Sequence, residues 1–313
     1  MDILEQHLSL LPAVRHMVKT RDASYYHHTT LHPRTITKNT ISIVMTSHER
    51  SQQVYYTLRM IQNSSIKDIQ VILVDDSSND VVQEAVLRLF PFQIDFIRII
   101  RAKKNWANPC VNYNIGFEYV QGGHVVIQNS EVCHVGDVLA HVHSQGMENT
   151  YYVYDVIASK SFETNHSIYE QDQLDNGIYR EHLWDRWYQH SIIRNLKYHF
   201  LCAMTRATFD KIGGFSYDYS FGSCYDDDDF LLKIKNASIT FQTVPNETYS
   251  IGGIHLFHGY RYNVSDTRAY TNPDNRALFE KKQRYLLVHQ TYLELSEQPP
   301  EHIVEAFQTL CSI

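Results

Sequence analysis

The sequence predicts an α/β protein whose sheet is mostly parallel and covered by helices on both faces. Four apolar runs rich in β-branched residues recur along the first half of the chain, a pattern typical of buried parallel strands. They start 28, 27 and 28 residues apart, at 41–46, 69–76, 96–102 and 124–129. This regular spacing leaves room for one helix between successive strands.

Helix-like segments fill these intervals, at 51–63, 79–90 and 108–120. Asn79 and Asn108 are expected N-caps, and Pro109 suits a first helical position. Strands joined by right-handed helical crossovers are parallel, so their C-terminal ends meet at one edge of the sheet. Ligands of such folds bind at that edge.

The segments that flank this region are expected to add helices. Residues 1–39 have the pattern of a helical arm followed by a Tyr- and His-rich loop. Towards the other end, apolar pairs seven residues apart mark one helical stripe between 276 and 297. We expect this stripe to pack on the chain's own domain in a monomer; the alternative is a homodimer interface.

Composition excludes several classes of protein. The net charge of -7 argues against non-specific nucleic-acid binding, which needs a basic face. No apolar stretch approaches 18 residues and no signal peptide is visible, so no membrane span is expected. The five cysteines are odd in number and none are spaced C-x-x-C, which favours reduced thiols and a cytoplasmic location.

Polar residues follow the first two predicted strands. The loop Thr46–Arg50 lacks the G-x-G-x-x-G of a dinucleotide site, which argues against a nicotinamide oxidoreductase. Its hydroxyl, charged and Arg groups can still hold a nucleotide and its phosphate. Its alternative interpretation is a simple cap, with Ser47 or Ser51 starting the helix. After the second strand, Asp75 can accept hydrogen bonds from a base or ribose, while Asp76 can instead cap the next helix.

These motifs resemble the start of a family 2 glycosyltransferase with a GT-A fold. The resemblance rests on VDDSS at 74–78, an altered TSHER at 46–50, and Asn114 and Gly116 in the third helix, and it extends over about 41–260. It implies a Rossmann-like, mostly parallel sheet and a nucleotide-sugar donor, here a UDP-sugar. The residues then expected to contact the donor are Thr46, His48, Arg50, Asp75, Asp76, Asn105, Trp106, Asn114 and Asn129.

The resemblance also implies a metal site. The family places an Asp-x-Asp after the fourth strand, where this chain has Asn129 and Glu131. Glu131 with His258 would hold Mn²⁺ (or Mg²⁺), and imidazole favours Mn²⁺. His255 would face the opposite side if both histidines lay in one strand. The alternative is a plain strand end without metal.

A run of four carboxylates is the clearest candidate for catalysis. Gly213, Gly214 and Phe215 precede Asp226–Asp229, which open a predicted helix. By resemblance Asp227 is the catalytic base, with Asp226 and Asp228 beside it, Phe230 on the family's Leu position and Lys233 on its Arg position. Like charges raise one another's pKa, and helical geometry lets at most two of the four face one site. The alternative is that the acids only complement the helix dipole.

Aromatic residues form a candidate acceptor platform. Trp184 and Trp187 precede the acidic helix, and aromatic faces stack on sugars. Their spacing equally fits a helical core stripe. Asp229 is a further expected acceptor contact.

The sequence as a whole therefore predicts a metal-dependent glycosyltransferase acting on a glycan or polypeptide hydroxyl, with hydroxylysine of collagen-type chains as one case. Its expected parts are an N-terminal helical arm (1–39), a GT-A domain (40–265) and a C-terminal helical extension (266–313). Within the domain, 40–131 is the nucleotide-sugar half and 132–265 the acceptor half. The alternatives are a sugar-binding module, which would explain the missing Asp-x-Asp, and a nucleotidyltransferase, which would need a Gly-rich loop at 46–50.

Overall fold

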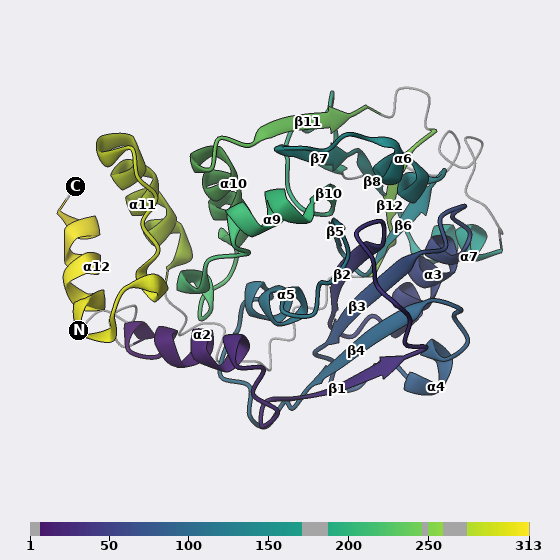
Figure 1. The fold of residues 1–313 in the computed structure, drawn as a ribbon, viewed down its shortest axis with the longest axis horizontal. Coiled ribbons are helices and arrows are strands. Elements are labelled where there is room, and N and C mark those ends of the chain that lie inside the picture. Colours follow the sequence, from purple (N-terminus) through teal and green to yellow (C-terminus); the bar gives the residue numbers. More distant parts are fainter. Residues whose placement is uncertain (1–6, 171–186, 246–249, 259–273, 313) are drawn as a thin grey trace.

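Eight strands form the central sheet in a computed structural model that describes residues 7–170, 187–245, 250–258 and 274–312 (Figure 1). The strands lie in the order β1-β4-β3-β2-β5-β10-β7-β11. Their bounds are β1 Tyr26–Leu31, β2 Ile41–Ser47, β3 Ile69–Asp75, β4 Gln93–Ile99, β5 His124–Gln128, β7 Thr150–Tyr154, β10 Leu201–Thr205 and β11 Thr240–Val244.

The middle of this sheet is parallel, as the sequence predicts. Strands β4, β3, β2 and β5 pair in parallel, and β7 pairs in parallel with β11. Strand β10 runs antiparallel between β5 and β7, and β1 runs antiparallel along β4. Every residue of β3 is buried, which explains its unbroken apolar pattern. The expected α/β class with a mostly parallel sheet is confirmed.

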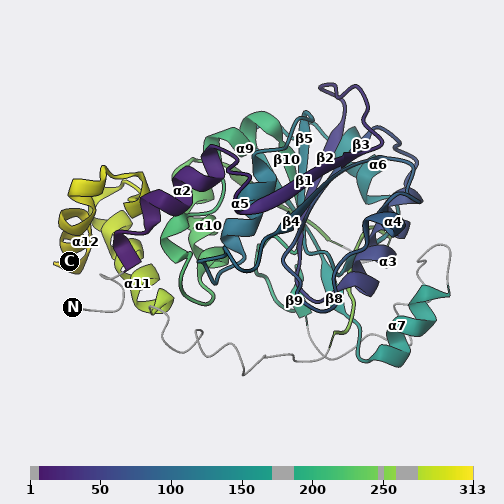
Figure 2. The same ribbon diagram turned by 90° about the horizontal axis from the view of Figure 1, so that it is seen from below.

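Helices cover both faces of the sheet (Figure 2). One face packs against α3 Ser51–Gln62, α4 Glu84–Leu87 and α6 Val138–Ser144. The other packs against α2 Leu11–Lys19, α5 Cys110–Phe117, α9 Arg206–Ile212 and α10 Asp226–Asn236. The two faces alternate along each strand: in β2, Ile43 faces the first set of helices and Val44 the second.

A second, four-stranded sheet lies beside the C-terminal ends of the parallel strands. Its order is β6-β12-β8-β9, with β6 Val132–Val135, β8 Val156–Ala158, β9 Trp187–Gln189 and β12 Gly252–His255, and α7 Phe162–Tyr169 packs nearby. Strands β6 and β12 are antiparallel, with His255 opposite Val132. This pairing brings the end of β12 next to the segment that follows β5.

The C-terminal helices pack against the chain's own domain. They are α11 Asn275–His289 and α12 Ile303–Cys311, joined through the short helices η3 Leu295–Glu297 and η4 Pro300–His302. Helix α11 contacts α10 and α12, and α2 contacts η3 and η1 Tyr217–Tyr219. The buried Lys282 amine of α11 lies 3.0 Å from Asp218 and 3.3 Å from Asp229 of α10. Both carboxylates therefore keep a cationic partner in the interior.

Two local predictions are wrong. The Tyr- and His-rich segment expected to be a loop contains β1, an edge strand whose pairing partner lies 63 or more residues further along. The helix expected over 79–90 shrinks to Glu84–Leu87, so Asn79 is not its N-cap. The Glu49 carboxylate accepts hydrogen bonds from the backbone amides of Ser78, Asn79 and Asp80, and this holds that stretch outside the helix.

The sequence predicts no membrane span and reduced cysteines. Within the described ranges, no helix has the length and apolar character needed to cross a membrane. All five cysteines lie in these ranges, and each is a free thiol.

Candidate functional site

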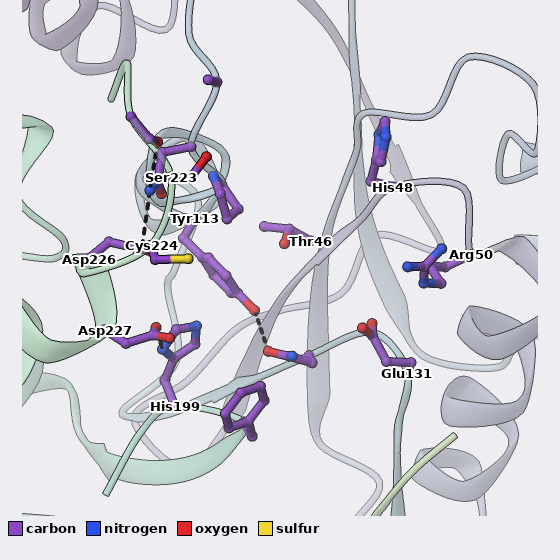
Figure 3. Close-up of a pocket in the computed structure, with 16 residues that line it drawn as sticks. Thr46, His48, Arg50, Tyr113, Glu131, His199, Ser223, Cys224, Asp226 and Asp227 are labelled. Carbon is purple, nitrogen blue, oxygen red and sulfur yellow. Dashed lines mark hydrogen bonds and ion pairs between the residues drawn. The ribbon is translucent and has the colours of Figure 1, made fainter. Parts of the chain in front are cut away.

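A cavity of about 420 Å³ opens at the C-terminal edge of the parallel strands (Figure 3). Its walls are the loop after β2, the start of α5, the segment after β5, the two residues before β10 and the turn into α10. The acids of α10 lie on one side of it and Glu131 and Arg50 on the other, with Tyr113 between them. The topology thus places the cavity where ligands bind in open α/β sheets.

The turn into α10 is strained. Cys224 and Tyr225 are consecutive non-glycine residues with φ of 62° and 64°, a conformation that costs about 1–3 kcal/mol each. The Asn275 side chain of α11 holds this turn by donating to the carbonyl oxygens of Tyr219 and Cys224. Gly222 lies so close that a Cβ there would be 2.2 Å from the Asn275 oxygen. The C-terminal extension therefore fixes one wall of the cavity.

The four carboxylates of α10 point in different directions. Only Asp226 and Asp227, of the four, line the cavity. Asp228 accepts a hydrogen bond of 2.9 Å from the Tyr198 hydroxyl. Asp229 is fully buried beside Lys282 and accepts from the Tyr219 hydroxyl at 3.1 Å. The acceptor contact expected of Asp229 is therefore wrong: the residue anchors α11 to α10.

The pKa of the Asp226 carboxyl is raised. Burial, and next the neighbouring Asp227 charge, raise the pKa of Asp226 to about 7, although a 3.0 Å hydrogen bond from the Asn108 amide opposes the shift. The sequence predicts raised pKa values from mutual repulsion, whereas burial is the larger cause here. Asp226 therefore keeps its proton to a higher pH than an ordinary aspartate, and the Asp227 side chain beside it is 29% exposed.

We expect Asp226→Asn to change how stability depends on pH. The unfolded carboxyl loses its proton near pH 4 and the folded one near pH 7, so the wild type loses stability as pH rises between these values. An amide keeps an acceptor for Asn108 and cannot ionise. Urea unfolding should show the variant gaining up to about 4 kcal/mol relative to wild type from pH 4 to pH 8. A constant difference across that range would contradict the assignment.

Glu131 and two histidines form a potential metal site. The Glu131 Oε1 atom lies 3.4 Å from His255 Nε2 and 3.7 Å from His258 Nε2, and the ligand atoms all lie within 4.8 Å of one another. Burial opposes ionisation of Glu131, but the hydrogen bond and charge of His255, then His258 and Arg50, lower its pKa to about 2. A carboxylate with two imidazoles fits a divalent transition metal such as Mn²⁺.

The expectation that His255 and His258 act apart is wrong. Strand β12 ends at His255, so the alternation of side chains along a strand does not extend to His258. The two rings lie 5.1 Å apart by their centroids. Asn129 is not part of this group of ligands. It lines the cavity and accepts a 3.1 Å hydrogen bond from the Tyr113 hydroxyl.

The end of β2 and the loop after it contribute three of the expected donor contacts to the cavity, namely Thr46, His48 and Arg50. His48 Nδ1 lies 2.9 Å from the Asp76 carbonyl oxygen. Arg50 donates to the Glu49 carbonyl, while its buried Nε has no hydrogen-bond partner among the described residues. An unpartnered guanidinium nitrogen beside a cavity is suited to an anionic ligand.

The acidic pair at the end of β3 lies outside the cavity lining. Asp75 is buried and accepts from the Ser77 hydroxyl and the Val82 amide, so it braces the following loop. Asp76 is buried in ion pairs with Arg101, at 2.7 Å, and Lys104. The capping role expected of Asp76 is wrong, because α4 begins after Gln83 and has no side-chain cap.

Other residues expected to contact the donor bond instead to the protein itself or lie away from the cavity. Trp106 is buried and donates to the Asn112 side chain at 2.8 Å, while Asn105 is exposed away from the cavity lining. Asn114 exchanges two hydrogen bonds of 2.9 Å with the backbone of Phe215, which joins α5 to the Gly-Gly-Phe turn. Trp184 and the side chain of Trp187 lie outside the described residues.

Sequence reasoning missed His199 and the ring of Tyr113. His199 Nδ1 lies 2.8 Å from the Asp227 Oδ1 atom, and both side chains line the cavity. Tyr113 donates to the Gln128 carbonyl and to Asn129. His199 is one of 18 histidines, and only its position just before β10 set it apart.

Comparison with known proteins identifies the family. The sequence model described as glycosyl transferase family 2 matches residues 42–212, more than half of the chain. The chain therefore belongs to glycosyl transferase family 2 and is a glycosyltransferase. No curated protein matches the chain significantly.

Solved structures share the GT-A fold at low identity. TarS of S. aureus aligns with a TM-score of 0.55 and 9% identity, covering 87% of this chain and 43% of that one. TarS 1-349 in complex with UDP-GlcNAc gives 0.54 and 12%, covering 87% and 71%. The chain thus spans less than half the length of the first of these TarS chains, and the likeness concerns the fold.

Proposed function

We propose that the protein transfers a sugar from a UDP-sugar to an acceptor hydroxyl with the help of a divalent metal. One observation carries this proposal: a single cavity has Asp227 in one wall and the Glu131 carboxylate in the other. An acceptor can meet a base on one side while the donor's diphosphate lies on the other. The fold relative TarS 1-349, which was solved with UDP-GlcNAc, supports a uridine nucleotide as donor.

The residues on the two sides of the cavity have separate roles in the proposed transfer. The acceptor oxygen forms a bond to the anomeric carbon while the bond from that carbon to the phosphate oxygen breaks. Asp227 takes the hydroxyl proton, and the nucleotide diphosphate leaves with the bonding electrons. Direct displacement of this kind inverts the anomeric carbon. Glu131, His255 and His258 would hold Mn²⁺, which supplies positive charge to offset the charge on the leaving diphosphate.

Arg50 and Asn129 complete the donor side. Both line the cavity, and the Arg50 guanidinium lies near Glu131, whose charge it stabilises. We assign Arg50 to the donor phosphates, Asn129 and Thr46 to hydrogen bonds with the donor, and His48 to the nucleotide side of the cavity. The acceptor is a hydroxyl on a glycan or a polypeptide, and hydroxylysine peptides are one member of this class.

A donor panel tests the proposal. The protein is incubated with UDP-, GDP- and dTDP-sugars and Mn²⁺, with and without glycan and hydroxylysine-peptide acceptors, and release of the nucleotide diphosphate is measured. We expect release from a UDP-sugar, stimulated by one acceptor class and abolished by a chelator. Absence of release from every donor would reject the proposal in favour of sugar binding alone. The anomeric configuration of the product, read by NMR, tests inversion.

A further inference from the structure

His199 makes a contact to Asp227 that the proposed reaction has not used. The histidine is 6% exposed, and its Nδ1 atom lies 2.8 Å from Asp227 Oδ1. Its ring meets Tyr113 and Phe215 edge-on, with centroids 4.9 and 4.8 Å away. Figure 3 shows the imidazole directly beside the Asp227 carboxylate at the cavity wall. The aromatic neighbours hold the ring in place.

The two polar atoms have no better partner. His199 Nδ1 and Asp227 Oδ1 are both shielded from solvent, and neither makes a well-angled hydrogen bond to any described residue. Their separation is that of a hydrogen bond, although the ring is turned from the ideal direction. Leaving both atoms unpaired would cost about 1–3 kcal/mol each. No other described polar atom satisfies either of them, so this contact is the one that the fold favours.

The other charged neighbours are engaged elsewhere. Asp226 accepts from Asn108, and Asp228 accepts from Tyr198. The Asp227 side chain is 29% exposed while its Oδ1 is shielded, which leaves Oδ2 as the oxygen that reaches the cavity. A carboxylate held by one oxygen presents the other in a fixed direction, and such orientation is a large part of general-base efficiency.

We propose that His199 is a positioning residue for Asp227: its Nδ1–H donates to Oδ1 and keeps Oδ2 directed at the acceptor hydroxyl. This inference rests on the proposed sugar transfer and on the role of Asp227 as base. The acceptor proton moves to Oδ2 as the acceptor oxygen bonds to the anomeric carbon. His199 keeps its own proton throughout, so no further reactant is needed.

Two substitutions separate hydrogen bonding from packing. His199→Asn keeps an N–H donor near the place of Nδ1 but loses the ring, whereas His199→Phe keeps the ring and loses the donor. With the donor sugar identified by the panel, we expect His199→Phe to lower kcat about 10- to 100-fold with little change in the KM for the donor. His199→Asn should retain most of the wild-type kcat.

Two controls make the result decisive. In an Asp227→Asn background, His199→Phe should cause no further loss, because its partner is already changed. If His199→Phe does not fold, an NMR measurement takes its place. The downfield imidazole N–H resonance of His199 should be present in the wild type and lost in Asp227→Asn.

The outcomes point to different conclusions. A fully active His199→Phe, an Asn variant as weak as the Phe variant, or an N–H resonance unchanged by Asp227→Asn would overturn the positioning role. A wild-type protein that releases nucleotide from no donor would instead reject the proposed function itself.

Discussion

Asp227→Asn should slow sugar transfer strongly while leaving the donor bound. Asp227 lines the cavity and keeps part of its carboxylate exposed, so it is the acid best placed to take a proton from an acceptor. An amide has nearly the same shape but is not basic. General-base catalysis contributes about 10²- to 10⁴-fold, and kcat should fall by that factor. Calorimetry with UDP should give a dissociation constant close to that of the wild type.

Asp228→Asn is the matched control for this experiment. It removes one carboxylate from the same helical turn, but Asp228 bonds to Tyr198 and does not line the cavity. Its kcat should therefore remain close to wild type. If Asp228→Asn is as inactive as Asp227→Asn, the general loss of acidic charge is responsible, and Asp227 has no special role as base.

Glu131→Gln should remove metal binding. The amide loses the negative charge that His255, His258 and Arg50 surround, and it leaves two imidazoles to hold a divalent ion alone. Changes outside the first coordination shell already cost 10- to 100-fold in affinity, so losing a direct ligand should weaken Mn²⁺ binding by at least about 100-fold. The electron paramagnetic resonance signal of free Mn²⁺ measures this without any turnover.

The metal experiment has its own controls. Glu163→Gln changes an exposed carboxylate at the start of α7 and should leave Mn²⁺ affinity as it is. His255→Gln and His258→Gln should each weaken binding, since both imidazoles lie near Glu131. Equal Mn²⁺ affinity in the wild type and Glu131→Gln would show that any metal binds elsewhere.

Local pattern was enough to predict the central strands. Strands β2, β3 and β5 lie within a residue or two of the predicted runs, because strands buried on both faces need unbroken apolar sequence. Edge strand β1 carries a weaker signal: its ends, Tyr26 and Leu31, are buried, but the residues between them are largely exposed or polar. Its place depends on β4, and no local pattern reports a partner so distant.

The candidate site likewise combines residues that the local sequence predicts with residues that only the fold brings together. The acids of α10 follow one another in sequence, so their position at a helix start was predictable. The meeting of Glu131 with His255 and His258 depends on the pairing of β6 with β12, more than 110 residues apart. Likewise, Asp75 and Asp76 matched a donor-binding motif, but their hydrogen-bond partners, Val82 and Arg101, could be found only from the fold.

The packing of α2 against the C-terminal segment affects how the chain matures during synthesis. Arg15 of α2 pairs with Glu297, 282 residues later. Helix α2 and the C-terminal helices α11 and α12 lie together, away from the sheet (Figures 1 and 2). At ribosomal rates this interval lasts roughly 15 to 60 s, far longer than a helix needs to form. In that time α2 can already pack against α5 and then η1, but its contact with η3 has to wait. Asn275 of α11 holds the turn into α10, so this wall of the cavity can be completed only after α11 has been made.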